Sequence, residues 1–148
     1  MFKNIVAGFD GSPESENALR LACDLAQKYA SEIHLVHTPQ PQINAIAMGA
    51  VGGFPATTTL PPLADVEKAC NRIVNSAKAI AQQKNINITQ TYTELGDPAD
   101  QIIACAENCN AELIVTGRRG LGSIGSFFQG STTVRVNQLA KFACLSVV

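Results

Sequence analysis

The chain has 148 residues, of which 46% are hydrophobic and 16% charged, and its net charge is −1. A chain of this length buries about two thirds of its unfolded surface, so a single domain spanning residues 1–148 needs no disulfide or metal to fold. The balanced charge argues against nucleic acid as a partner. The uncharged stretch at residues 38–64 is too interrupted by proline and glycine to span a membrane.

Cysteine and histidine positions give no sign of a disulfide or metal site. The five cysteines are odd in number and lack paired spacing, so buried free thiols in a reducing, cytoplasmic location are expected. Cys105 and Cys109 share one face of a helix, but a bridge between them would be strained. His34 and His37 have odd spacing on a strand and point to opposite faces, so neither is assigned as a metal ligand.

Local signals in the first half of the chain predict two strands and two helices. Residues 5–7 form an apolar run that ends at a glycine turn, as is typical of a central parallel strand. Ser12 and Pro13 then open a helix, because serine caps the first turn and proline fits its first position. Apolar residues predict a second strand at 33–36, and helical spacing predicts a helix at 66–84.

A segment rich in proline, glycine and threonine, at about residues 39–63, separates that strand from that helix. It is long for a loop in a compact domain, and such loops are commonly functional or disordered. Two interpretations stay open: its apolar side chains cover a ligand like a lid, or the segment is a flexible excursion.

The second half of the chain continues the alternation of strands and helices. Residues 87–95 alternate apolar and polar side chains, which predicts an edge strand. Asp97 and Pro98 open a third helix with the same signals as the first, and Asn110 is placed to end it. A strand at residues 112–116, a helix at 131–141 and a strand at 143–148 complete the chain.

Strands that alternate with helices predict an α/β fold with a single doubly wound, five-stranded parallel sheet and helices on both faces, in a Rossmann-like arrangement. The expected strand order is 3-2-1-4-5. In such sheets ligands bind beyond the carboxyl ends of the strands, where the winding direction reverses. That point lies between the first and fourth strands. The turn at Asp10 and the loop at Gly117 are therefore expected to face each other across strands about 5 Å apart.

The stretch at residues 117–132 is expected to bind phosphate. Its glycines follow a buried strand and precede a helix, so backbone N–H groups can approach an anion closely. The first N–H groups of a helix have no partner within it, and the helix dipole favours negative charge there. Residues 113–148 also contain no acid, whereas the rest of the chain carries −5. The cations of this segment are Arg118, Arg119, Arg135 and Lys141.

Two common phosphate-binding patterns fail on this loop. Gly120, Gly122 and Gly125 match the G-x-G-x-x-G dinucleotide pattern, but too little chain follows for a second βαβ half. Gly125 and Gly130 are spaced like the glycines of a Walker A loop, but Ser131 stands where its lysine belongs. One further spacing fits without such a conflict: Gly117-x2-Gly120-x9-Gly130-Ser131.

This last spacing resembles the nucleotide-binding signature of the universal stress protein family. Residues 4–12 are similar to the family's first strand and turn, and His37 stands where its second strand often carries histidine. Gly96, Asp97 and Pro98 resemble the residues that begin the family's third helix. The resemblance covers nearly the whole chain outside residues 40–62. It implies an adenine nucleotide alpha hydrolase-like fold and a homodimer joined through the last strand, and it leaves open whether dimers pair into tetramers.

The resemblance also implies an adenine nucleotide, ATP, ADP or AMP, with or without Mg²⁺, in the crevice. By similarity, Asp10 meets the ribose, and main-chain groups near Gly8, Phe9 and Thr38 bracket the adenine. The residues expected to hold the phosphates are Gly117, Arg119, Gly120, Gly130, Ser131 and Thr132. Electrostatics agrees for Asp10, since a carboxylate is repelled by phosphates and is better placed against sugar hydroxyls or Mg²⁺.

The implied function is a stress-response protein that senses or regulates through its bound nucleotide. No catalytic residue is assigned, because phosphoryl transfer needs a group that orients the nucleophile, and the glycine loop has no carboxylate, histidine or lysine. Two alternatives stay open: a slow Mg²⁺-dependent nucleotide hydrolase that uses Asp10, and a structural dimer with an empty crevice. Regulatory protein partners are not identified by the sequence.

Overall fold

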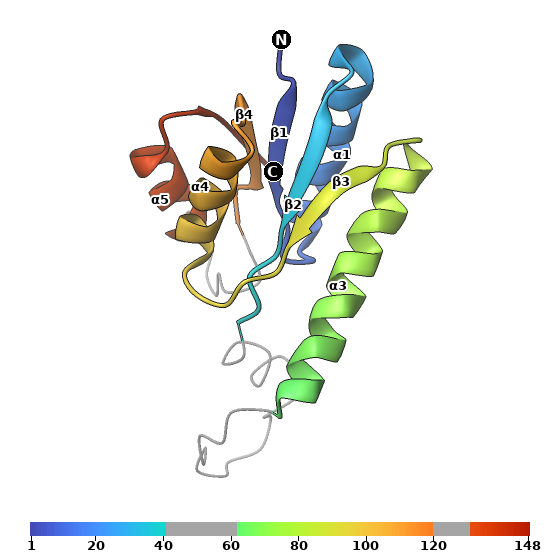
Figure 1. Cartoon of the computed structure of the whole chain (residues 1–148), viewed down its shortest axis with the longest axis vertical. Helices are drawn as coiled ribbons and strands as arrows, with labels where there is room; N and C mark the ends of the chain where they lie inside the picture. The colour runs from blue at the N-terminus through green and yellow to red at the C-terminus, as the bar shows by residue number, and fades with distance from the viewer. Residues whose placement is uncertain (41–61, 120–130) are drawn as a thin grey trace.

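The computed structural model describes residues 1–40, 62–119 and 131–148 of the chain (Figure 1). In chain order the elements are β1 Asn4–Gly8, α1 Pro13–Tyr29, β2 Glu32–Val36, α3 Leu63–Gln83, β3 Ile88–Tyr92, α4 Pro98–Asn108, β4 Leu113–Gly117, α5 Ser131–Leu139 and β5 Ala143–Val147. Residues 41–61, most of the segment interpreted as a lid or a flexible excursion, lie outside the described residues, and so do Gly120 and Gly130.

The five strands form one parallel sheet with the order β3-β2-β1-β4-β5, which confirms the expected fold. β1 is central, and Val6 lies in register with His34 of β2 on one side and Ile114 of β4 on the other. The chain first winds outward through β2 and β3 and then returns to β4. The winding direction therefore reverses between β1 and β4, as the sequence predicted.

Helices cover both faces of the sheet, with α1 and α3 on one side and α4 and α5 on the other (Figure 1). Successive strand residues point to opposite faces, so each strand contributes to both cores. Ile5 and Ala7 of β1 pack in the core under α1 and α3, while Val6 packs in the core under α4 and α5. This explains why residues 5–7 form an uninterrupted apolar run.

Two helices begin with the caps that the sequence predicted. The Ser12 hydroxyl accepts a hydrogen bond from the Ser15 N–H at 3.2 Å, and Pro13 is the first residue of α1. The Asp97 carboxylate accepts from the N–H groups of Ala99 and Asp100 at the start of α4. After α4 the backbone of Asn110 turns left-handed, with φ of 51°, so its expected role as a helix terminator is confirmed.

Some sequence-based expectations differ from the structure, including the end of the last helix, which lies at Leu139 instead of residue 141. β3 ends at Tyr92 instead of residue 95, because the chain then leaves the sheet for the turn at Gly96, where φ is 138°. All five cysteines are free, as expected, but only Cys23 and Cys105 are buried. The others lie at half-exposed positions on α3, just after α4 and on β5, since an amphipathic helix or an edge strand offers only part of its surface to the core. No helix among the described residues is long and apolar enough to cross a membrane.

Candidate functional site

The turn that follows β1 holds Asp10 at the switch point of the sheet. One oxygen of its carboxylate, Oδ1, accepts a hydrogen bond from the Ser12 N–H at 2.9 Å. Gly11 between them has φ of +83°, which glycine adopts without strain. The Asp10 carboxylate is thus tied to the first residues of α1, and the side chain is half-buried at the carboxyl end of the central strand.

Phe9 and His37 extend the hydrogen bonding of the sheet beyond the ends of β1 and β2. The Phe9 N–H donates to the Val36 carbonyl at 2.9 Å, and the His37 N–H donates to the Tyr92 carbonyl at the same distance. The Nδ1 atom of His37 lies 2.9 Å from the Phe9 carbonyl oxygen. Phe9, whose main chain is expected to contact the base, therefore lies at the site, but its N–H is already hydrogen-bonded to β2 within the sheet.

Gly8 and Gly117 stand on neighbouring strands, and both have packing reasons for lacking a side chain. A Cβ atom on Gly8 would lie 2.8 Å from the Cδ1 atom of Ile102 in α4. A Cβ atom on Gly117 would lie 2.8 Å from backbone atoms of Glu14 and Ser15 in α1. The end of β4 thus sits directly against the first turn of α1. Gly117 and the turn that carries Asp10 therefore lie close together at the carboxyl ends of β4 and β1, as the sequence predicted.

Thr38, which was expected to bracket the base, is almost completely enclosed at the end of β2. Only 8% of the residue is exposed, and its hydroxyl has no hydrogen-bond partner within the described residues. Other buried hydroxyls at this end of the sheet are paired, including those of Ser12 and Ser15. An unpaired buried hydroxyl is unusual, and a bound water or ligand is a common reason for one.

The start of α5 is anchored to the end of β4. Thr133, which is 2% exposed, donates its hydroxyl to the Gly117 carbonyl at 2.7 Å. Ser131 and Thr132 form the beginning of the helix, where the first N–H groups have no partner inside it. The two ends of the glycine loop are thus fixed next to each other. Sequence reasoning missed Thr133, because nothing in its local pattern distinguishes it from the hydroxyl residues before it.

One of the cations counted toward the phosphate site is paired with acids from another part of the chain. Arg135 of α5 pairs with both Asp97 and Asp100 of α4, with nitrogen–oxygen distances of 2.9 Å. The packing of α5 against α4 brings these carboxylates to a cation that was counted toward the phosphate site. Of the two adjacent arginines, Arg118 is exposed and Arg119 is half-buried.

The two histidines are both buried. His34 lies in register with Val6, on the α4 and α5 side of the sheet, whereas the His37 ring contacts the main-chain carbonyl of Phe9. Burial is the main cause that lowers the pKa of each ring, and for His37 the Phe9 carbonyl and Asp10 partly oppose this effect. Both rings are therefore neutral near pH 7.

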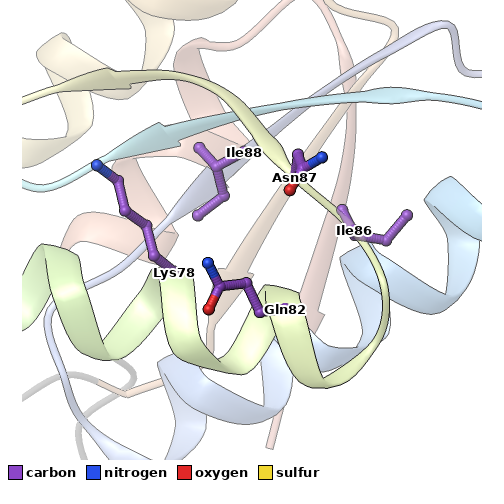
Figure 2. Close-up of a pocket in the computed structure, with 5 residues that line it drawn as sticks. All are labelled: Lys78, Gln82, Ile86, Asn87 and Ile88. Carbon is purple, nitrogen blue, oxygen red and sulfur yellow. The ribbon is translucent and has the colours of Figure 1, made fainter.

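A pocket of about 110 Å³ lies at the other end of the sheet (Figure 2). Its lining comes from the last turns of α3 and the start of β3, so it opens near the amino ends of the strands. The residues are Lys78, Gln82, Ile86, Asn87 and Ile88. Pockets for small organic ligands usually have volumes of about 300–1,000 Å³. This pocket is too small for a nucleotide and is separate from the candidate site.

Comparisons of sequence and of structure with known proteins both find universal stress proteins. The model of the universal stress protein family matches residues 1–147. Universal stress protein YxiE of Bacillus subtilis is 27% identical over 148 residues, which cover 99% of each chain. A solved universal stress protein in complex with cAMP is 22% identical, with a TM-score of 0.70 and coverage of 99% of this chain and 97% of the other. The universal stress protein from Archaeoglobus fulgidus in complex with dAMP is 18% identical, with a TM-score of 0.68 and coverage of 100% and 98%.

Proposed function

Because the chain belongs to the universal stress protein family, we propose that it binds an adenine nucleotide in the crevice between the carboxyl ends of β1 and β4. The observation that carries this proposal is the anchoring of the start of α5 to Gly117, on the strand next to the Asp10 turn. A helix start favours phosphate, and a carboxylate on the neighbouring strand favours sugar hydroxyls. Complexes of related proteins with cAMP and dAMP support the same ligand class.

The proposed ligand lies across the ends of three adjacent strands. Its base is placed near the main chain of Gly8 and Phe9 and the end of β2, where the unpaired Thr38 hydroxyl gives the base a hydrogen-bonding partner. Its ribose meets Asp10. Its phosphates lie at the start of α5, which contains no acid of its own. The proposed phosphate ligands are Gly117, Arg119, Gly120, Gly130, Ser131 and Thr132.

The chemistry of these groups fits ATP, ADP or AMP. If Mg²⁺ accompanies the nucleotide, phosphate oxygens and the Asp10 carboxylate are the hard oxygen ligands that this ion prefers. Among the described residues, no group of three His, Cys, Asp or Glu side chains is arranged to hold a metal ion by itself. A metal would therefore arrive with the phosphates.

We propose a sensor or regulator in the stress response of the cytoplasm, and not an efficient enzyme. The nucleotide would change the surface that the protein offers to partners. We also propose a homodimer through β5, which pairs with β4 on one side and is the last strand of the sheet order. An edge strand has backbone groups available for pairing with a second copy.

Purified protein tests the proposal directly. Denaturation should release a compound with the absorbance and chromatographic retention of an adenine nucleotide. Calorimetric titration of nucleotide-free protein should show binding of AMP, ADP or ATP, with weaker binding of guanine nucleotides. Gly130→Val should abolish this binding while circular dichroism stays unchanged, because the side chain would occupy the phosphate site. Ser76→Ala on the exposed face of α3 is the matched control.

Two results would contradict parts of the proposal. If neither released nucleotide nor binding is detected, the crevice is not a nucleotide site and the protein is better described as a structural dimer. If single-turnover assays show ATP cleavage at about 1 per second that Asp10→Asn removes, the protein is an Mg²⁺-dependent hydrolase. Binding without such turnover supports the sensor.

A further inference from the structure

We propose that His37 is a positioning residue that holds Asp10 in place for recognition of the ribose; this inference rests on the proposed nucleotide site. His37 directly follows β2, is 4% exposed, and places Nδ1 2.9 Å from the Phe9 carbonyl oxygen. A carbonyl oxygen can only accept a hydrogen bond, so Nδ1 must carry the proton. The contact therefore selects one tautomer of a neutral, buried ring.

The bond from His37 acts on the peptide group that joins Phe9 to Asp10. The carbonyl of this peptide belongs to Phe9 and is held by the His37 ring. Its N–H belongs to Asp10 and lies 3.4 Å from the Ser15 hydroxyl. Both ends of one peptide plane are thus contacted by side chains from other elements. Rotation of this plane would move the Asp10 carboxylate, so the His37 ring limits where the carboxylate can lie.

His37 itself is fixed by the sheet. Its N–H donates to the Tyr92 carbonyl of β3, and the Phe9 N–H donates to the Val36 carbonyl of β2. The ring therefore connects a rigid pair of strands to the turn that carries Asp10. The carboxylate is tied on its other side, through the Ser12 N–H, to the start of α1. The His37 bond thus holds the carbonyl of the Phe9–Asp10 peptide from the strand side, while Ser12 and Ser15 contact Asp10 from the α1 side.

Three variants separate positioning from general support of the fold. His37→Leu keeps an apolar side chain of similar size but removes the donor to the Phe9 carbonyl. His37→Asn places an amide N–H₂ near the position of Nδ1 and can restore that bond. His34→Leu is the matched control, because His34 in β2 is also a buried histidine, yet its ring nitrogens have no hydrogen-bond partner within the described residues.

The readout is the ratio of the affinities for AMP and 2′-deoxy-AMP, measured by calorimetry. A carboxylate that accepts the 2′-hydroxyl makes wild type prefer AMP. His37→Leu should lose about tenfold in AMP affinity and little in deoxy-AMP affinity, so that the ratio falls toward one. His37→Asn should recover most of the wild-type ratio, and His34→Leu should keep it.

Several outcomes would overturn the inference while nucleotide binding stands. These are a wild-type ratio of one, an unchanged ratio in His37→Leu, an equal loss for both nucleotides, and failure of His37→Asn to restore the ratio. If His37→Leu does not fold, His37→Gln replaces it, because its longer amide lies near Nε2 and does not reach the Phe9 carbonyl. If wild type binds neither nucleotide, the proposed function and this inference fall together.

Discussion

Replacing Thr38 by valine removes a buried hydroxyl that has no partner within the described residues, while the shape of the side chain is kept. Because 8% of Thr38 is exposed, the hydroxyl has lost nearly all contact with solvent. An unpaired buried polar group costs about 1–3 kcal/mol, and we take the lower end for a single hydroxyl. Thr38→Val should therefore raise the free energy of unfolding of the ligand-free protein by about 1 kcal/mol.

The same change should weaken nucleotide binding if the base satisfies the hydroxyl. A lost neutral hydrogen bond of about 1 kcal/mol corresponds to roughly fivefold weaker binding of AMP. One substitution would thus act with opposite signs on stability and affinity. Urea unfolding of nucleotide-free protein measures the first effect, and calorimetric titration with AMP measures the second. The stability gain should appear as an increase in Tm of about 2–4 °C.

Thr133→Val is the matched control, because the substitution is identical and the site is also buried. Here the hydroxyl donates to the Gly117 carbonyl at 2.7 Å, so its loss should destabilise the protein by about 1–2 kcal/mol. If Thr38→Val destabilises ligand-free protein as much as Thr133→Val does, the Thr38 hydroxyl has a partner there and the reasoning is refuted. If Thr38→Val is stabilised but binds AMP as tightly as wild type, the Thr38 hydroxyl does not contact the nucleotide.

Four further changes test other parts of the structure. Gly117→Ala should lower the free energy of unfolding, measured in urea, by about 2 kcal/mol, because the new Cβ meets the backbone of α1. Gly8→Ala should lower it less, because only the tip of the Ile102 side chain must move. The pKa of His34 is lowered from 6.5 in the folded state, so the unfolded chain binds its proton more readily and stability falls as the pH drops below about 6.5. His34→Leu should therefore reduce the loss of unfolding free energy measured between pH 7 and lower pH. If this loss is unchanged in the variant, groups other than His34 cause it. Burial raises the pKa of Cys105 to about 12, so its alkylation at pH 8.5 should be far slower than in unfolded protein, and equal rates would show that α4 opens readily. Val147→Lys on β5 should halve the mass measured by light scattering if dimers form through this edge, and an unchanged dimer mass would place the interface elsewhere.

Several features of the fold could be predicted because their causes are local. Ser12 followed by Pro13, and Asp97 followed by Pro98, specify helix starts through atoms only two or three residues away. The apolar run at residues 5–7 predicts a strand buried on both faces. Alternation of such strands with helices leaves few possible topologies, so the order β3-β2-β1-β4-β5 was also within reach.

The candidate site was predicted less completely, since its contacts join residues far apart in the chain. The count of cations near the glycine loop was correct, but Arg135 pairs with carboxylates that lie 35 and 38 residues earlier. Gly117 was predicted as a phosphate ligand, and the structure adds a packing role against α1. The roles of its neighbours in binding stay predictions.

The sequence by itself determined which segments are strands and helices, where the main caps lie, and at which end of the sheet a ligand is expected. These properties follow from hydrophobic periodicity and from hydrogen bonds between near neighbours. Only the tertiary structure decided three contacts. His37 donates to the Phe9 carbonyl, Thr133 donates to the Gly117 carbonyl, and Arg135 forms ion pairs with two carboxylates of another helix. Each of these contacts requires two elements to pack at one distance and angle, which depends on all the side chains between them.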